Sequence, residues 1–245
     1  MNDFRDARML VTGASGKLGT AVLNELAKGG AKNVMAGSRD PARITASAAQ
    51  KVRLDFDDAA SMEAAFRGVD RLLIISTDAL DEPGKRGRQH RAAVEAAARA
   101  GVGHILYTSM TNPGPESLIP FAPDHRSTEV AIGATGLPHT ILRNNWYHDN
   151  LLFSLPQLLA SGQWFTSAGA GRVGYVARSD CAAAAAGALL TKGGSATHDI
   201  TGPAALTVEE VAAVVNAAFG KSIKVVQVSD DDLAAGMRAP RFPNR

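Results

Sequence analysis

Short apolar runs alternate along the first part of this chain with longer segments in which apolar residues recur every three or four positions. The apolar runs occupy residues 8–13, 33–38, 51–56, 71–76, 104–109 and 139–144. Runs of this length are typical of strands buried on both faces, and the segments between them predict helices. In residues 17–28, for example, Leu18, Val22 and Leu26 share one helical face. The alternation predicts a parallel sheet with helices on both faces.

The pattern is looser after residue 144. We expect helices from Asp180 onward and over 208–219, and strands over 198–201 and 223–228. Thr207 and Glu210 have the spacing of a capping box, which marks the start of a helix. The predicted fold class is α/β: a Rossmann-like doubly wound parallel sheet in residues 1–150, with a smaller α/β lobe in residues 151–245. We expect this lobe to be partly interleaved with the first domain.

The stretch VTGASGKLG, residues 11–19, places three glycines between the first predicted strand and the first predicted helix. Gly13 suits a tight turn, Gly16 lets the backbone approach a pyrophosphate, and Gly19 allows close packing of the helix. The helix N-terminus then offers N–H donors and a favourable dipole to phosphates. A glycine-rich turn without a ligand is the alternative, but its place in this order of elements favours dinucleotide binding. We assign this part of the cofactor site to Gly13, Ser15, Gly16, Lys17, Leu18 and Gly19.

The residues that follow the second predicted strand favour NADP(H) over NAD(H). NAD-binding proteins usually carry Asp or Glu there for the ribose hydroxyls, whereas this chain has Ser38 and Arg39. The Arg39 guanidinium can bind a 2′-phosphate, and Lys17 can add a second positive charge. The acidic neighbour of Arg39 weakens the argument, and a surface charge is the alternative. After the third strand, we expect Asp55 to make a polar contact with adenine and Phe56 to pack against it.

Composition and charge limit the classes of partner and cofactor that the sequence predicts. The net charge of +2 and the pI near 8.8 are too mild to indicate a nucleic-acid interface, and the basic run at 85–91 is interpreted as a solvated helix start. Cys181 is the single cysteine, which excludes an intramolecular disulfide and indicates a small buried residue. Histidines and cysteines lack metal-site spacing, the N-terminus is polar, and no apolar run is long enough to span a bilayer. We therefore expect a cytoplasmic protein with no metal, no membrane contact and no nucleic-acid partner.

The catalytic pair of the common short-chain reductases is missing. Those enzymes use Tyr-x-x-x-Lys, in which the tyrosine donates a proton and the lysine lowers its pKa. None of Tyr107, Tyr147 and Tyr175 is followed by lysine at that spacing, and Tyr107 is expected to face the core. The usual carbonyl–alcohol mechanism therefore has no evident proton donor here.

Five stretches together resemble the NmrA-like atypical branch of the short-chain reductases. They are RQHRAAVEAA, GVGHILYTS, DHRSTE, TGLPHTILRNNWYHDN and RSDCAAAAA, of which LRNNWY is the most specific. Within that branch the similarity is to bacterial NAD(P)H:quinone oxidoreductases of the QOR2 type and to triphenylmethane reductases. The resemblance implies a Rossmann domain, a small substrate lobe, NADPH bound without flavin, and no Tyr-Lys pair. Family members usually continue beyond APRFPNR, so we expect the acceptor pocket to depart from theirs more than the cofactor site.

The resemblance also implies roles for individual residues. Further cofactor-binding positions are Ser76, Thr77, Gln89, Ser109, Asn144 and Trp146, with His90 beside Gln89 facing the cleft. Either Tyr147 or His125 is expected to supply a proton or hold the acceptor carbonyl, with a capping or surface role as the alternative for His125. The implied reaction is hydride transfer from NADPH to a quinone or a similar conjugated acceptor, which needs little acid catalysis because the product anion is stabilised.

Other functions fit the same residues. A redox-sensing regulator of the NmrA kind would bind the dinucleotide without turnover, and the missing Tyr-Lys pair fits it equally well. A pathway-specific reductase, isomerase or lyase on this fold is a third possibility, because fold alone does not determine function. LRNNWY favours the enzyme, and the sequence leaves monomer and homodimer both open.

Overall fold

The computed structural model describes residues 4–46 and 49–238, so the segment APRFPNR lies outside the described residues. The chain divides into two compact units. The first comprises Met1–Asn145 and Val176–Ile200, and the second comprises Trp146–Tyr175 and Thr201–Arg245. The chain therefore passes from one unit to the other three times, after Asn145, Tyr175 and Ile200.

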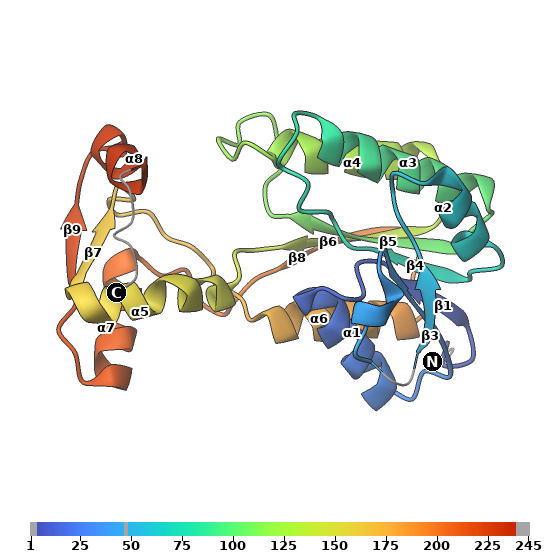
Figure 1. Ribbon diagram of the computed structural model, residues 1–245, viewed down its shortest axis with the longest axis horizontal. Helices are drawn as coiled ribbons and strands as arrows, with labels where there is room; N and C mark the ends of the chain where they lie inside the picture. Colours follow the sequence, from blue (N-terminus) through green and yellow to red (C-terminus); the bar gives the residue numbers. More distant parts are fainter. Residues whose placement is uncertain (1–3, 47–48, 239–245) are drawn as a thin grey trace. The chain divides into compact units, whose positions relative to one another are not determined.

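The first unit is built on a parallel sheet of seven strands (Figure 1). The strands are β1 (Arg8–Val11), β2 (Asn33–Ser38), β3 (Gln50–Arg53), β4 (Arg71–Ile74), β5 (His104–Met110), β6 (His139–Asn144) and β8 (Ala196–Ile200). Their order in the sheet is β3-β2-β1-β4-β5-β6-β8, and every neighbouring pair is parallel. The predicted doubly wound α/β fold is thus confirmed. Its strand order reverses between β1 and β4, which makes the carboxyl ends of these two strands the expected ligand position.

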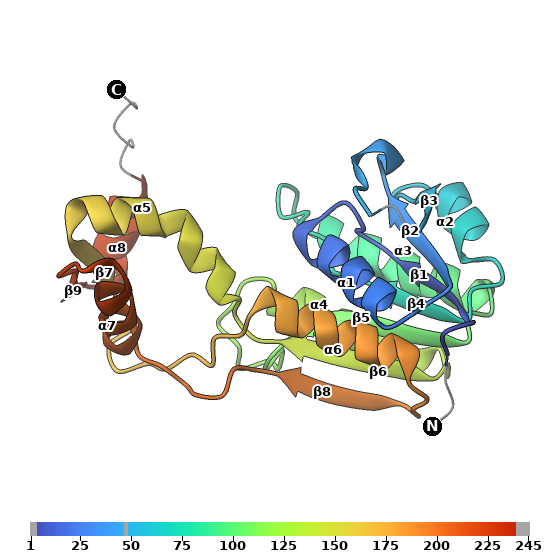
Figure 2. The same cartoon turned by 90° about the horizontal axis from the view of Figure 1, so that it is seen from below.

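Helices cover both faces of the sheet (Figures 1 and 2). They are α1 (Lys17–Lys28), α2 (Ala59–Phe66), α3 (Lys85–Arg99), α4 (Ala122–Ala134) and α6 (Arg178–Leu190), with a short 3₁₀ helix η1 (Pro41–Arg43) after β2. α1 and α6 enclose one apolar core against the sheet, and α2, α3 and α4 enclose the other. The predicted helix over residues 17–28 is confirmed, and its buried side chains include Val22, Leu23 and Leu26. Cys181 is buried in α6 as expected.

The second unit is smaller and contains two parallel strands, β7 (Gln163–Thr166) and β9 (Lys224–Gln227). Its helices are α5 (Leu151–Ser161), α7 (Val208–Phe219) and α8 (Asp230–Arg238), with a 3₁₀ helix η2 (His148–Asn150). The predicted capping box is present at the start of α7, where Thr207 and Glu210 bond each other's backbone N–H groups. Over the described residues, every helix is too short or too polar to cross a membrane.

Candidate functional site

The glycine turn lies between β1 and α1, at the reversal of strand order. Gly13 has φ +59°, a left-handed conformation that favours glycine, and its carbonyl accepts a hydrogen bond of 2.9 Å from Gly16 N–H. A Cβ atom at Gly19 would clash with Gly13 O and lie 2.8 Å from Ala14 Cα. Gly13 therefore makes the tight turn, as predicted. Gly19 allows α1 to approach the backbone of the turn itself.

The N-terminus of α1 has the properties of an anion site. Gly16 is its N-cap residue, and no side chain caps the first turn, which also contains no acidic residue. Gly16 and Lys17 are both exposed. The N–H groups of a first helical turn have no partner inside the helix and carry partial positive charge. The exposed, uncapped first turn of α1 thus fits an anion such as a phosphate group.

The end of β2 lies next to this turn. The Ser38 hydroxyl shares a hydrogen bond of 2.9 Å with the Ser15 hydroxyl and accepts another of 3.2 Å from Asp40 N–H. Asp40 caps the 3₁₀ helix η1, since its carboxylate accepts from Ala42 N–H at 3.1 Å. The acidic neighbour that weakened the case for Arg39 therefore has a structural role of its own. Arg39 is exposed where β2 ends.

Hydrogen bonds within the loop after β3 and from α3 hold this loop in place. Asp55 Oδ1 accepts from Asp57 N–H at 3.1 Å, and Gln89 Nε2 donates to Asp57 Oδ2 at 2.7 Å. Gln89 is 4% exposed, and its Oε1 atom is buried without a hydrogen-bond partner among the described residues. Phe56 is 8% exposed and belongs to the core cluster that includes Phe66. The packing of Phe56 against adenine stays a prediction.

The chain leaves β4 in a segment whose backbone is bound by side chains. The N–H groups of residues 75–77 donate, in order, to Thr12 Oγ1, Thr108 Oγ1 and His90 Nε2, at 2.9 Å each. Thr12 directly follows β1, Thr108 lies in β5 and His90 lies in α3. Because three separate elements hold one short segment, the backbone at the end of the central strand has a fixed conformation.

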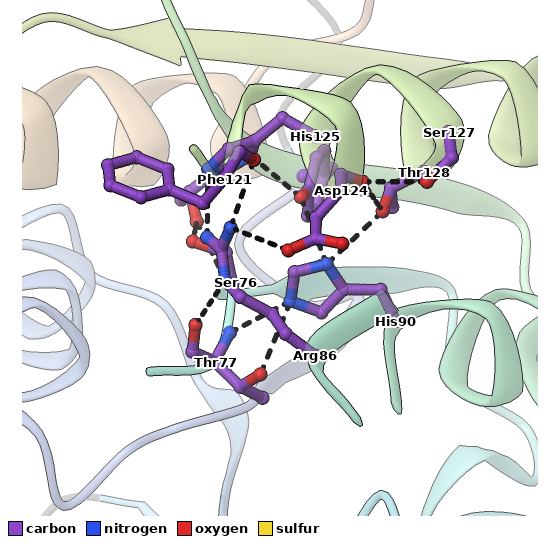
Figure 3. A network of polar contacts seen from close by, with 11 residues as sticks. Ser76, Thr77, Arg86, His90, Phe121, Asp124, His125, Ser127 and Thr128 are labelled. Atoms are coloured by element: carbon purple, nitrogen blue, oxygen red, sulfur yellow. Dashed lines mark hydrogen bonds and ion pairs between the residues drawn. The ribbon is translucent and has the colours of Figure 1, made fainter. Parts of the chain in front are cut away.

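A buried polar network continues from His90 (Figure 3). Arg86 Nη2 lies 2.8 Å from His125 Nε2, and His125 Nδ1 lies 2.9 Å from the Tyr107 hydroxyl. A backbone N–H and a guanidinium can only donate, so Nε2 of each histidine accepts and each ring carries its proton on Nδ1. Burial and the charge of Arg86 lower the pKa of His90 and of His125 to about 3. Both rings are therefore neutral.

The buried network corrects two predictions from the sequence, one about residues 85–91 in α3 and one about His125 in α4. The interpretation of residues 85–91 as solvated is wrong for Arg86, Gln89 and His90, which are at most 6% exposed. They share the face of α3 that packs against the sheet, because their spacing is three and four residues. His125 is also buried, at 3% exposure, and both of its ring nitrogens have partners. The capping and surface alternatives for His125 are thus wrong.

Tyr107 faces the core as predicted and is fully buried. Burial raises the pKa of its hydroxyl. The hydroxyl lies within hydrogen-bond distance of Nδ1 of both histidines, 3.3 Å from that of His90. Tyr107 therefore holds its position in the network rather than meeting a ligand.

A second polar cluster joins the ends of β5 and β6. Glu129 on α4 accepts from Arg143 Nε at 3.0 Å and Nη2 at 2.6 Å, and from the Ser109 hydroxyl at 2.6 Å. This hydrogen bonding to Glu129 raises the pKa of Arg143. This pair was not predicted from the sequence, although Glu129 and Arg143 lie in two of the stretches that carried the resemblance. Asn144, at the end of β6, is buried in the same unit.

Trp146 and Tyr147 begin the second unit, next in sequence to Asn144 and Asn145. Trp146 is half exposed, and Tyr147 precedes the 3₁₀ helix η2. Within the described ranges, no three His, Cys, Asp or Glu side chains are grouped so as to hold a metal ion.

Comparison with known proteins shows the relationship of the chain. Residues 13–192 match a family described as NAD(P)H-binding. Quinone oxidoreductase 2 of Escherichia coli is 35% identical over 96% of this chain and 82% of its own length. An NmrA-like family domain-containing oxidoreductase of Aspergillus flavus is 29% identical over 96% of this chain and 79% of its own.

Solved structures show the same relationship. The NADPH complex of E. coli quinone oxidoreductase QOR2 matches with a TM-score of 0.89 and 33% identity, covering 96% of this chain and 83% of that one. The NADP(H) complex of Citrobacter sp. triphenylmethane reductase matches with a TM-score of 0.88 and 32% identity, covering 97% and 85%. The resemblance found from the sequence is thus confirmed: the chain belongs to the NAD(P)H-binding family and is a homologue of these NmrA-like reductases.

Proposed function

We propose that this protein is an NADPH-dependent oxidoreductase that transfers hydride to a quinone or a similar conjugated acceptor. The observation that carries the proposal is the glycine turn with its uncapped helix N-terminus, placed at the reversal of strand order in a chain of this family. The names of the relatives add support, since they include a quinone oxidoreductase and an NAD(P)H azoreductase.

The proposed cofactor residues have distinct tasks. The N–H groups at the start of α1 would bind the pyrophosphate, and the exposed Arg39 and Lys17 would bind the 2′-phosphate of NADPH. The segment of Ser76 and Thr77 would line the dinucleotide from the end of β4. When bound, NADPH supplies the hydride, and the protein supplies orientation.

The buried groups of the first unit support a conjugated acceptor, because they offer no readily available proton. Hydride addition to a simple ketone yields an alkoxide that needs a proton, whereas addition to a quinone yields a stabilised phenolate. In the first unit, Tyr107 is fully buried with a raised pKa, and His125 is neutral with its proton directed to Tyr107. We therefore propose Tyr147, rather than His125, as the residue that holds or protonates the acceptor oxygen.

The test is the loss of NADPH absorbance when purified protein meets a panel of quinones and triphenylmethane dyes, with NADH in parallel. Saturable turnover that is faster with NADPH is the expected result. Arg39→Ala should weaken NADPH and leave NADH little changed, and an equal loss for both would refute the 2′-phosphate role. Calorimetric binding of NADPH without turnover on any acceptor would instead favour a dinucleotide sensor.

A further inference from the structure

Arg86 is a buried cation whose best hydrogen bonds are not to a carboxylate. Its side chain is 7% exposed, and its ion-pair partner among the described residues, Asp124, lies 3.7 Å away and is itself 27% exposed. The shorter contacts of the guanidinium go to Thr77 O at 2.7 Å and to His125 Nε2 at 2.8 Å. Burial lowers the pKa of Arg86, which reflects the cost of placing this charge inside the protein. The burial of this charge must therefore be explained by what its contact with the Thr77 carbonyl does.

The carbonyl belongs to the segment that leaves β4. Arg86 Nε binds Thr77 C=O, and His90 Nε2 accepts from Thr77 N–H at 2.9 Å, so the same residue is held at both polar groups of its backbone (Figure 3). Arg86 and His90 are four residues apart on α3 and therefore share one helical face. α3 thus holds the backbone of Thr77 from one side.

Arg86 also reaches a second loop at the same edge of the sheet. Its Nη1 donates to Phe121 O at 3.4 Å, and its guanidinium lies 5.3 Å from the centre of the Phe121 ring. Phe121 ends the loop between β5 and α4. One side chain therefore joins the loop after β4 to the loop after β5, and both loops leave carboxyl ends of the sheet, where dinucleotides bind in such folds.

We infer that Arg86 and His90 are positioning residues that hold the Ser76–Thr77 segment in the conformation that binds the dinucleotide. This inference rests on the proposed function. Both residues are buried, so they act through the backbone of Thr77 and not by touching the cofactor. A segment that is already ordered loses less conformational entropy on binding, which raises affinity.

His90→Leu and His90→Gln separate this role from simple core packing. Leucine fills the space without an acceptor for Thr77 N–H, whereas the glutamine Oε1 can take the place of Nε2. We expect His90→Leu to raise the Kd for NADPH about tenfold, and His90→Gln to restore most of the affinity. Amide hydrogen exchange at Thr77 should become faster in His90→Leu and stay slow in His90→Gln.

His104→Leu is the matched control. His104 is also buried, at 3% exposure, and bonds a threonine hydroxyl, Thr140 Oγ1 at 2.9 Å. It begins β5, however, and so lies at the amino ends of the strands, away from the carboxyl ends where Thr77 lies. We expect His104→Leu to be less stable than the wild type but to bind NADPH with unchanged Kd. Equal weakening of binding by His90→Leu and His104→Leu would mean that lost stability explains the effect, and would overturn the inference.

Arg86→Lys provides a second route if His90→Leu does not fold. Lysine keeps the charge but lacks the planar fork that spans Thr77 and His125, so we expect the Kd for NADPH to rise about tenfold again. Wild-type affinity for NADPH in a folded His90→Leu or Arg86→Lys variant would overturn this inference but leave the proposed function standing. A wild-type protein that bound no dinucleotide by calorimetry would overturn the proposed function as well.

Discussion

Acidification should destabilise the first unit through His90 and His125 before most carboxylates begin to titrate. In the folded protein each Nε2 accepts a hydrogen bond from a group that can only donate, Thr77 N–H or the Arg86 guanidinium. A second proton on either ring would remove that bond and add a charge beside Arg86. The pKa of both rings is accordingly lowered to about 3, whereas the ordinary value is about 6.5.

The sign and the size of the effect follow from proton binding. Between the two pKa values the unfolded chain binds protons that the folded one does not, so stability is present above about pH 6.5 and is lost as the pH falls toward about 3. From about pH 6 to about pH 5, an unfolded histidine is mostly protonated, and the loss is about 1.2 kcal/mol per ring. The pair should therefore cost about 2 to 2.5 kcal/mol over this interval. The result requires only that the folded pKa values lie well below 5, and burial and the charge of Arg86 lower both to about 3.

Guanidinium unfolding followed by circular dichroism at both pH values measures the total loss, to which His104 also contributes because burial lowers its pKa to about 4. His125→Gln keeps an acceptor for Arg86 but cannot titrate, so it should lose about 1.2 kcal/mol less than the wild type over the interval. His198→Gln, at an exposed position on β8, is the matched control for removing a histidine. If His125→Gln kept the full pH dependence of the wild type, or if both variants reduced it equally, the assignment of neutral buried rings would be wrong.

Two further predictions concern the turn and the Glu129 cluster. Gly19→Ala should destabilise the protein by roughly 1–3 kcal/mol and weaken NADPH binding, because its Cβ would clash with Gly13 O. The control is Gly187→Ala in α6, where a Cβ meets nothing within 4 Å, and this variant should be neutral or stabilised by up to about 1 kcal/mol. A similar loss of stability in both variants would contradict the steric argument. Glu129→Gln should lower the unfolding free energy by about 1–3 kcal/mol, because Arg143 loses a bidentate ionic partner, and unchanged stability in guanidinium unfolding would show that solvent replaces the bond.

The sheet could be predicted because parallel strands buried on both faces leave a simple signal. β4 and β5 have apolar centres, LLI and ILY, and every residue in both strands is buried. The glycine turn was equally readable, since the positive φ at Gly13 and the close approach at Gly19 admit glycine alone. α5 and β7 were not predicted, because α5 has Pro156 inside it and β7, with the sequence QWFT, has only two apolar residues and is mostly exposed or half-buried.

The polar networks could not be read from the sequence with the same ease. Glu129 and Arg143 meet only because α4 packs beside the ends of β5 and β6, and this tertiary packing leaves no pattern in the sequence. The residues of α3 did leave a signal: Arg86 and His90 recur with the helical period of the buried Ala93 and Val94. That period was outweighed by the charge of the run around them, since arginine is rarely buried without a paired carboxylate.

The buried polar groups behind the strand ends bear on how the proposed reaction would proceed without a Tyr-Lys pair. In the first unit, the histidines and the tyrosine behind the strand ends are buried and bonded to one another or to backbone, with His90 and His125 both neutral. Such groups fix a conformation, because each would have to break a bond inside the protein before it could transfer a proton. A site built on fixed backbone favours catalysis by orientation of the hydride donor and acceptor. Acceptors whose reduced form is a stable anion are the ones for which orientation is sufficient, and this is the chemical reason for preferring a quinone to a simple ketone as the substrate.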